Sequence, residues 1–382
     1  MNIPYGRQNI SQSDIDSVYE VLQSDWLTQG PSITRFEEQL QSNFDVRFAT
    51  VVSSATAALH IACLSLGLKE GDYLWTSANT FVASANCGLY CGALVDFVDI
   101  ELDNYNICID ALEDKLIKAE KEGKLPKIVI AVHFSGKSCD MHAIKELSNK
   151  YGFHIIEDAS HAVGATYDNG LVGSCKYSDI TVFSFHPVKI ITTGEGGVAL
   201  TNNPITHEKL TRLRSHGITR NKDQLNENHG AWYYEQHHLG FNYRMTDIQA
   251  ALGSSQLVKL NTFLERRHHI HNEYSKLLDK FPLKLTKKSD VRGSSLHLYP
   301  VLVDDPSDRK PLFDYLRKNN IGVNVHYIPV YKQPFFQSLG FSYDHCVNAE
   351  FYYQREISLP MFPGLTQQDL QRVKEVIDGY FE

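Results

Sequence analysis

The sequence has no Cys-x-x-Cys pair and no long apolar run. Its seven cysteines are scattered, and an odd number of cysteines without an export signal favours reduced, mostly buried thiols over disulfides. The stretch 1–7 lacks the apolar core of a signal peptide, and no segment approaches the length that crosses a bilayer. These absences predict a soluble, cytoplasmic protein that is not attached to a membrane.

Positive charge is also in short supply. Lysine and arginine total 37 against 45 aspartates and glutamates, for a formal net charge of −8, and no dense basic stripe occurs. A nucleic-acid-binding protein needs such a concentrated basic surface, so this class is disfavoured. An anionic small-molecule substrate remains allowed, because a local pocket can bind it whatever the net charge of the chain.

Two common kinds of ligand site are missing as well. No Gly-x-Gly-x-x-Gly turn follows an early strand, which argues against a dinucleotide-binding dehydrogenase. Cys87 and Cys91 stand one helical turn apart in an apolar stretch, where core packing is a better interpretation than a metal site. His268, His269 and His271 lie in a charged helical stretch, so we expect them on a solvated face and expect no metal site.

Short apolar segments alternate with helical patterns through the first 200 residues of this 382-residue chain. We expect helices at 11–24, from Pro31 onward, and at 56–66, 82–90, 109–121 and 141–151. Strands are expected at 50–53, 73–76, 93–97, 128–133, 154–157, 179–185 and 197–201. Such apolar strands separated by helices predict an α/β protein with a mainly parallel central sheet that carries helices on both faces.

The pattern changes after residue 201. A long helix is expected from 246 to about 281, followed by strands at 296–303 and 322–327 and by helices at 311–318 and 367–380. We therefore expect a large α/β domain over 1–250, with an N-terminal helical segment. Residues 251–382 would form the long linking helix and a smaller C-terminal α+β domain.

One lysine stands between an apolar strand and a glycine-rich turn. The strand ends near Phe185, Lys189 follows, and Gly194, Gly196 and Gly197 permit a tight backbone path behind it. A lysine amine that is desolvated or influenced by nearby charge becomes a nucleophile and condenses with carbonyl groups. A random lysine in such a place is usually a surface residue beside a loop, so this interpretation depends on the rest of the chain.

Three further features follow strands, at the edge of the sheet where parallel sheets bind their ligands. The small residues of 53–59 enter a helix, whose free N–H groups favour a phosphate. Asp158 ends an apolar strand and is suited to pair with a protonated pyridine nitrogen, and Phe81 is placed to stack on a flat ring. Each feature alone has an ordinary explanation: a helix cap, an aspartate that caps a turn, and a core phenylalanine.

Together, the phosphate-binding segment, the aromatic ring, the carboxylate and the lysine occur in an order that resembles fold-type-I enzymes that use pyridoxal 5′-phosphate (PLP). More narrowly, the chain resembles the DegT/DnrJ/EryC1/StrS family of nucleotide-sugar aminotransferases over nearly its whole length. The segments that carry the resemblance are 27–31, 53–59, 157–162, 183–197, 214–217, 241–247 and 325–329. The resemblance implies a PLP-dependent transferase with a large cofactor-binding domain and a smaller C-terminal domain.

The resemblance also implies a role for each matching residue. Lys189 would hold the cofactor covalently and move protons, and Asp158 would pair with its pyridine nitrogen, so these two are the expected catalytic residues. Phe81 would stack on the ring, and Asn242 would reach in from a second subunit, which implies a homodimer with shared active sites. The remaining cofactor contacts are implied for Ala55, Thr56 and Ser184 at the phosphate and for His161 near the phenolic oxygen.

Tyr5 and the segments 25–30 and 184–189 are closest to the branch of the family that acts in pseudaminic acid biosynthesis. In that branch an amino group moves from L-glutamate to C4 of a UDP-linked 4-keto-6-deoxy-N-acetylhexosamine. Arg220 and Arg244 are candidates for contacts with the diphosphate. The other substrate contacts would come from Tyr5, Trp26, Leu27, Thr28, Ser54, Ser184, Asn242, Asn324, His326 and Tyr327.

Other interpretations stay open. An aminotransferase for another nucleotide 4-keto sugar, of the UDP-4-amino-arabinose or GDP-perosamine type, also fits, because specificity depends on few pocket contacts. A PLP-binding regulator without turnover is an alternative of another class. Related 3-dehydrases carry histidine in place of the cofactor-binding lysine, so Lys189 argues against that reaction.

Overall fold

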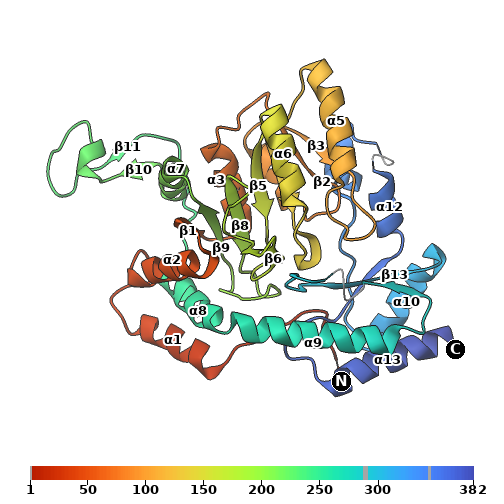
Figure 1. The fold of residues 1–382 in the computed structure, drawn as a ribbon. Helices are drawn as coiled ribbons and strands as arrows, with labels where there is room; N and C mark the ends of the chain where they lie inside the picture. The colour runs from red at the N-terminus through yellow and green to blue at the C-terminus, as the bar shows by residue number, and fades with distance from the viewer. Residues whose placement is uncertain (1, 287–290, 343–345) are drawn as a thin grey trace.

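The computed structural model describes residues 2–286, 291–342 and 346–382. Within these residues, the centre of the molecule is a seven-stranded sheet (Figure 1). In order across the sheet, the strands are β1 (Phe48–Val52), β9 (Gly197–Thr201), β8 (Ile180–Ser184), β5 (His154–Asp158), β4 (Ile128–Val132), β2 (Tyr73–Ser77) and β3 (Leu94–Val98). β9 runs antiparallel to both neighbours and the other neighbouring pairs are parallel, which confirms the mainly parallel prediction.

Helices cover both faces of the sheet, because successive strand residues point to opposite sides and both sets are apolar. Ile156 packs on one side and its neighbour Ile155 on the other. The side of Ile156 is covered by α3 (Ala55–Ser65), α4 (Ala83–Tyr90) and α7 (Pro204–Arg214). The opposite side is covered by α5 (Ile109–Glu122), α6 (Met141–Tyr151), α2 (Pro31–Phe44) and α8 (Asp247–Val258).

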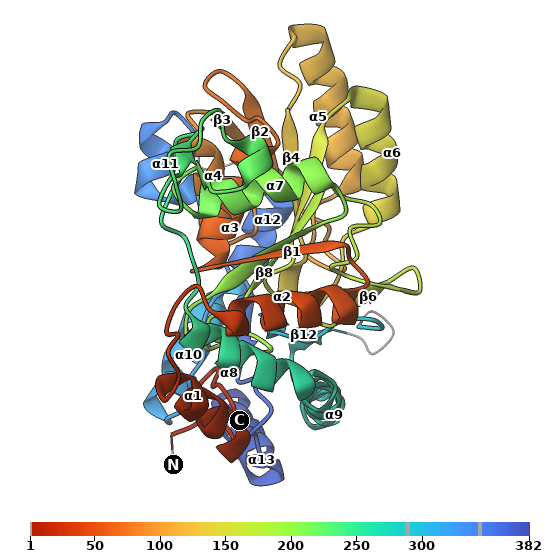
Figure 2. The same cartoon turned by 90° about the vertical axis from the view of Figure 1, so that its left-hand side faces the viewer.

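The C-terminal part builds a second, antiparallel sheet. Its strands are β12 (Leu283–Leu285), β13 (Tyr299–Val303) and β14 (Glu356–Leu359). These strands share a core with α9 (Leu260–Leu278), α10 (Pro306–Lys318) and α13 (Gln367–Phe381). Ile3 joins the same core and pairs with Ile321, and α13 also packs into this core, so both ends of the chain lie at this end of the molecule (Figures 1 and 2). The division between 1–250 and 251–382 stays a prediction.

Smaller elements complete the chain. The strands β10 (Ile218–Thr219) and β11 (Glu235–Gln236) form a hairpin that projects from the body of the molecule beside α7 (Figure 1). The other short elements are α1 (Gln12–Leu22), β6 (Thr166–Tyr167), β7 (Gly170–Leu171), α11 (Pro334–Ser338), α12 (Val347–Tyr353) and the 3₁₀ turns at Phe134–Gly136, Lys222–Gln224 and Val330–Lys332. In the part of the chain that the structure describes, no helix is long and apolar enough to cross a membrane.

The long helix predicted from 246 to about 281 is two helices. Lys259, with φ of −94° and ψ of 3°, separates α8 from α9, and its side chain reaches the buried Asp14 of α1. The turn lets α8 pack against α1 and α2 while α9 packs against α13. Sequence periodicity continues across this point and does not reveal the change of direction.

Two further predictions are corrected by the C-terminal part. Residues 322–327 do not form a strand. Asn324 bridges Ser358, but the N–H of Val325 donates to the side chain of Asn324 (2.9 Å), and the N–H of His326 donates to the side chain of Glu356 (2.8 Å). The prediction that His268, His269 and His271 of α9 all lie on a solvated face is wrong for His271. Arg267 and His271 are each 1% exposed, because α9 buries this side against the C-terminal core.

Candidate active site

A cavity of about 640 Å³ lies beside the carboxyl ends of β1, β5 and β8, where parallel sheets bind ligands. Most of the site residues predicted from the sequence meet there. The predicted cofactor residues that line it are Ala55, Thr56, Phe81, Asp158, His161, Ser184 and Lys189. The predicted substrate residues that line it are Tyr5, Ser54, Ser184, Asn324, His326 and Tyr327.

Lys189 lies on a loop whose two ends are tied together at Phe185. The N–H of Phe185 donates to the carbonyl of Gly196, and the N–H of Thr193 donates to the carbonyl of Phe185, each at 2.9 Å. The Lys189 side chain is partly exposed to the cavity. Burial lowers the pKa of its amine to about 8, against the opposing effect of Asp158. A usable fraction of the amine is therefore uncharged near neutral pH, as a base or nucleophile requires.

We expect Lys189→Met to stabilise the ligand-free protein at neutral pH. A pKa of about 8 in the folded state, against 10.5 ordinarily, corresponds to a cost of at most about 3 kcal/mol for burying the charge. This cost is fully present below the folded pKa and fades as the pH rises toward the unfolded pKa, because the folded state loses its proton first. Urea unfolding should give the variant a larger free energy of unfolding than the wild type at neutral pH. The difference should become smaller at alkaline pH. Equal stability of the two proteins at neutral pH would contradict the prediction.

Asp158 is a buried carboxylate at the end of β5, only 6% exposed. One oxygen accepts the hydroxyl proton of Ser84 (2.6 Å), and the other accepts the N–H of Ser160 (3.1 Å). Among the described residues, no lysine, arginine or histidine forms an ion pair with it. A buried carboxylate is stable when it faces a cation, so Asp158 suits a ligand that carries a positive charge on this wall of the cavity.

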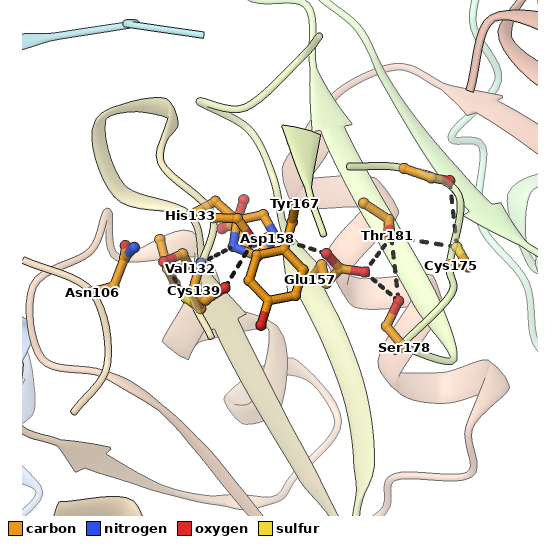
Figure 3. A network of polar contacts seen from close by, with 12 residues as sticks. Asn106, Val132, His133, Cys139, Glu157, Asp158, Tyr167, Cys175, Ser178 and Thr181 are labelled. Atoms are coloured by element: carbon orange, nitrogen blue, oxygen red, sulfur yellow. Dashed lines mark hydrogen bonds and ion pairs between the residues drawn. The ribbon is translucent and has the colours of Figure 1, made fainter. Parts of the chain in front are cut away.

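The opposite face of the same strand end is anchored by a polar network (Figure 3). His133 donates from Nε2 to Glu157 (2.7 Å), and its Nδ1 accepts the N–H of Cys139 (3.2 Å). The other oxygen of Glu157 accepts from Ser178 (2.5 Å) and Thr181 (2.9 Å). Burial alone would raise the pKa of Glu157, but these hydrogen bonds lower it overall. The fixed carboxylate holds the strand end from which Asp158 enters the cavity.

The first turn of α3 presents backbone N–H groups that suit an anion. Ser54 caps the helix by accepting the N–H of Ala57 (3.1 Å), and the N–H groups of Ala55 and Thr56 lie in the first turn, which offers them no acceptor within the helix. Gly197 of β9 lies against this turn so closely that a Cβ would stand 2.5 Å from the nitrogen of Ala55. The free N–H groups and the positive end of the helix favour a phosphate here.

His161 and Tyr327 form the wall next to Lys189. The Nδ1 atom of His161 accepts the N–H of Ser135 (3.3 Å), and its Nε2 atom lies 3.2 Å from the Tyr327 hydroxyl. Burial, together with the charge of Lys189, lowers the pKa of His161 well below its ordinary value, so the imidazole is neutral. Since Nδ1 accepts, Nε2 carries the proton and donates to Tyr327. The hydroxyl proton of Tyr327 is thereby left to donate into the cavity.

Phe81 is not a core residue, so the alternative explanation for this phenylalanine is wrong. It stands between β2 and α4 with 57% of its surface exposed, and its ring centre lies 6.2 Å from that of Tyr327. An exposed aromatic face on a cavity wall is suited to stack on a flat ligand.

Among the predicted site residues that do not line this cavity are Trp26, Leu27, Thr28 and Asn242. They lie in neighbouring segments, since Thr28 pairs with Thr246 and Asn242 pairs with Ser215. Arg220 and Arg244 line a separate cavity of about 580 Å³. There Arg244 donates to the Ser215 hydroxyl (3.0 Å), and the Arg220 guanidinium lies over the ring of Tyr234.

Sequence reasoning missed several residues that shape the site. Ser84 bonds to Asp158 across 74 positions of the chain, and His297 lines the cavity from the loop before β13. Glu356 and Ser358 on β14 support the histidine of the 324–327 segment. None carries a local motif, and the contacts become visible only when distant segments are brought together.

A model of the DegT/DnrJ/EryC1/StrS aminotransferase family matches residues 8–378. The chain belongs to this family. Membership in the DegT/DnrJ/EryC1/StrS family confirms the predictions that the protein is an enzyme and an aminotransferase. The family assignment also agrees with a cavity that presents a lysine, a carboxylate and a helix N-terminus together.

Known members of the DegT/DnrJ/EryC1/StrS family are similar over the whole chain. The UDP-4-amino-4,6-dideoxy-N-acetyl-beta-L-altrosamine transaminase of Campylobacter jejuni is 39% identical over 383 residues, covering 100% of this chain and 98% of that protein. The structure of Helicobacter pylori PseC, an aminotransferase involved in the biosynthesis of pseudoaminic acid, matches with a TM-score of 0.91 at 32% identity and covers 100% of this chain and 99% of that one. Spr1654 from Streptococcus pneumoniae, solved in a PLP form, gives a TM-score of 0.88 at 28% identity, over 99% of this chain and 98% of that one. These structures confirm the predicted fold class.

Proposed function

We propose that the protein transfers an amino group from L-glutamate to C4 of a UDP-linked 4-keto-6-deoxy-N-acetylhexosamine, with PLP as cofactor. The observation that carries the proposal is that one cavity holds a lysine with a lowered pKa, a buried carboxylate that forms no ion pair with the described residues, and a helix N-terminus. The choice of a UDP sugar is supported by the 39% identity to the altrosamine transaminase over the whole chain.

The residues around the cavity fit PLP at each of its groups. The first turn of α3 and the Ser184 hydroxyl would bind the phosphate, and Asp158 would face the pyridine nitrogen. Phe81 would stack on the ring, and Lys189 would bind the aldehyde carbon. Bound in this way, the cofactor supplies an electron sink for negative charge that develops on the carbon beside the transferred nitrogen.

Lys189 would then act as the base and acid of the reaction. Its Nζ removes the α-proton of glutamate in the first half of the reaction and delivers a proton to C4 of the sugar in the second. A pKa of about 8 suits both tasks, because the amine can be neutral or charged near neutral pH. Asp158 would keep the pyridine nitrogen protonated by holding a negative charge next to it.

The sugar nucleotide would bind against Tyr5 and the 324–327 segment. Tyr327 offers a hydroxyl donor, as its pairing with His161 implies, and Tyr5 stacks obliquely on His326 with ring centres 5.8 Å apart. Arg220 and Arg244 are our candidates for the diphosphate. Because they line the separate cavity, they would have to act on a ligand bound by a second copy of the chain.

We assign Trp26, Leu27, Thr28 and Asn242 to the active site of a second subunit, in a homodimer with shared sites. Trp26 and Leu27 are 54% and 49% exposed, and neither lines the cavity of its own chain. If the sites are shared, Lys189→Ala and Asn242→Ala remove groups from the same site through different chains. A mixed dimer of the two variants should then contain one site with both defects and one intact site.

Co-expression of these two variants under different affinity tags tests the shared site. Purified mixed dimers should recover about half of the wild-type activity per dimer, while each variant alone stays largely inactive. Light scattering of the same samples checks that the species is a dimer. Mixed dimers that are no more active than the better single variant would contradict the assignment of Asn242.

The nucleotide and sugar are tested by a substrate panel. Glutamate-dependent amination is measured with UDP-, GDP- and dTDP-linked 4-keto sugars at equal concentrations. The proposal predicts the highest kcat/KM for the UDP-linked 4-keto-6-deoxy-N-acetylhexosamine. Preference for a GDP- or dTDP-linked sugar would overturn the UDP assignment, and absence of turnover with every sugar would favour a regulatory protein.

A further inference from the structure

A buried chain of hydrogen bonds runs from the cavity wall into the C-terminal sheet. It begins at His326, which lines the cavity and is 6% exposed, and it continues to Ser358 and Glu356 on β14, which are both fully buried. The Nδ1 atom of His326 lies 2.8 Å from the Ser358 hydroxyl, and that hydroxyl lies 2.5 Å from Oε1 of Glu356.

The two ends of this chain fix the direction of every hydrogen bond in it. At the cavity end, Oδ1 of Asn324 accepts the N–H of Val325 (2.9 Å), so the amide nitrogen of Asn324 faces Nε2 of His326 (3.3 Å). An amide nitrogen only donates, and Nε2 therefore accepts. At the other end, Oε2 of Glu356 accepts the backbone N–H of His326 (2.8 Å). Burial raises the pKa of this carboxyl to about 8, against the lowering effect of its hydrogen bonds with Ser358 and His326, so Oε1 is free to accept once the carboxylate is ionised, above a pH of about 8.

When Glu356 is ionised, the imidazole proton must therefore be on Nδ1. Burial, with Lys189 nearby, lowers the pKa of His326 to about 3, so the ring is neutral and carries a single proton. Nδ1 donates this proton to Ser358, and Ser358 donates its own to Glu356. Each donor in the chain then meets one acceptor, and His326 cannot give a proton to a ligand from Nε2.

We propose that Ser358 and Glu356 are positioning residues that hold His326 as a hydrogen-bond acceptor at Nε2 for the sugar substrate. The group of the substrate that meets His326 is then a donor, a sugar hydroxyl or an amide N–H, and not a phosphate or carbonyl oxygen. The bond from Asn324 is long for a hydrogen bond, so a better-placed substrate donor can replace it. The choice of substrate group rests on the proposed function; the proton position does not.

Glu356→Gln is the most informative substitution, because it keeps the shape of the side chain and reverses the direction of the hydrogen bonds between Glu356 and His326. The amide oxygen must accept the N–H of His326, so the amide nitrogen faces Ser358 and donates to it. Ser358 then turns its proton toward Nδ1, and the imidazole proton moves to Nε2. Ser358→Ala instead removes the middle link and leaves Nδ1 without its acceptor.

The proton position is measured by ¹⁵N NMR of the holoenzyme with labelled histidine at about pH 9, where the Glu356 carboxylate is ionised, with His326→Asn as the assignment control. We expect Nδ1 of His326 to be protonated in the wild type and in the control Ser254→Ala, which removes a hydroxyl that has no hydrogen-bond partner among the described residues. We expect Nε2 to be protonated in Glu356→Gln. A wild-type His326 protonated at Nε2, or an unchanged proton position in Glu356→Gln, would overturn the proposal.

Kinetics of the two half-reactions test the role in substrate binding. Glu356→Gln and Ser358→Ala should each raise KM for the keto sugar about tenfold, the value of one hydrogen bond, while the half-reaction with glutamate stays within about twofold. Equal losses in both half-reactions, or an unchanged KM for the sugar, would overturn the positioning role. If the wild type aminates no keto sugar, the proposed function fails, and the NMR measurement still decides where the proton lies.

Discussion

Lys189→Ala is expected to reduce amino transfer by at least about 10³-fold, because one side chain supplies both the covalent attachment of the cofactor and the proton transfers. The loop that carries Lys189 is closed at Phe185, so no neighbouring side chain can take its place without rearrangement. Lys189→Arg should be nearly as inactive, since it keeps a cation but cannot lose its proton at working pH. Steady-state rates with glutamate and the keto sugar measure the effect.

The attachment itself is measured separately from turnover. Borohydride reduction of the wild type, followed by peptide mass spectrometry, should place the reduced cofactor adduct on Lys189. Lys176→Ala is a matched control, because Lys176 is an exposed lysine that pairs with Asp168 and does not line the cavity. A Lys189→Ala protein that still yields a borohydride-reducible adduct, or retains more than a tenth of the activity, would refute the assignment.

Asp158→Asn is expected to lower the rate of amino transfer about 10²- to 10³-fold, the range found when one preorganised electrostatic group is removed from an active site. The amide keeps the size of the side chain and can still accept one of the bonds from Ser84 and Ser160. It carries no negative charge, however, so the pyridine nitrogen loses the partner that keeps it protonated. Single-turnover rates with glutamate isolate this effect from product release.

Ser84→Ala separates charge from position at the same site. Ser84 donates to Asp158 but bears no charge, so its loss should cost no more than about tenfold. Asp168→Asn, at an exposed carboxylate of the surface, should leave the rate unchanged. Comparable losses in Asp158→Asn and Ser84→Ala would show that placement, and not the charge, is what Asp158 contributes.

The sequence predicts the part of the site that is built at the ends of parallel strands. Asp158 and Ser184 each end an apolar strand, and Ser54 opens the helix after β1. Because the carboxyl ends of parallel strands meet at one edge of the sheet, local patterns are enough to bring these residues together. The same logic explains why the order of helices and strands through residue 201 agrees with the structure.

The C-terminal half of the site could not be predicted in this way. The segment from Asn324 to Tyr327 reaches the cavity because side chains of β14 take the hydrogen bonds that a strand would have made, and β14 has no motif of its own. The break at Lys259 depends on the buried Asp14, which lies 245 residues earlier. Such contacts join segments whose local sequences look ordinary, and only the folded chain reveals them.

Transfer of a labelled amino group tests the account most directly. The enzyme is incubated with ¹⁵N-labelled L-glutamate and the UDP-linked 4-keto-6-deoxy-N-acetylhexosamine, and the products are separated and examined by NMR and mass spectrometry. The account predicts that the ¹⁵N appears as an amine on C4 of the sugar, with one 2-oxoglutarate formed for each amino sugar, and that Lys189→Ala yields neither. A sugar that returns unlabelled and unaminated from a wild-type enzyme carrying its cofactor would contradict it.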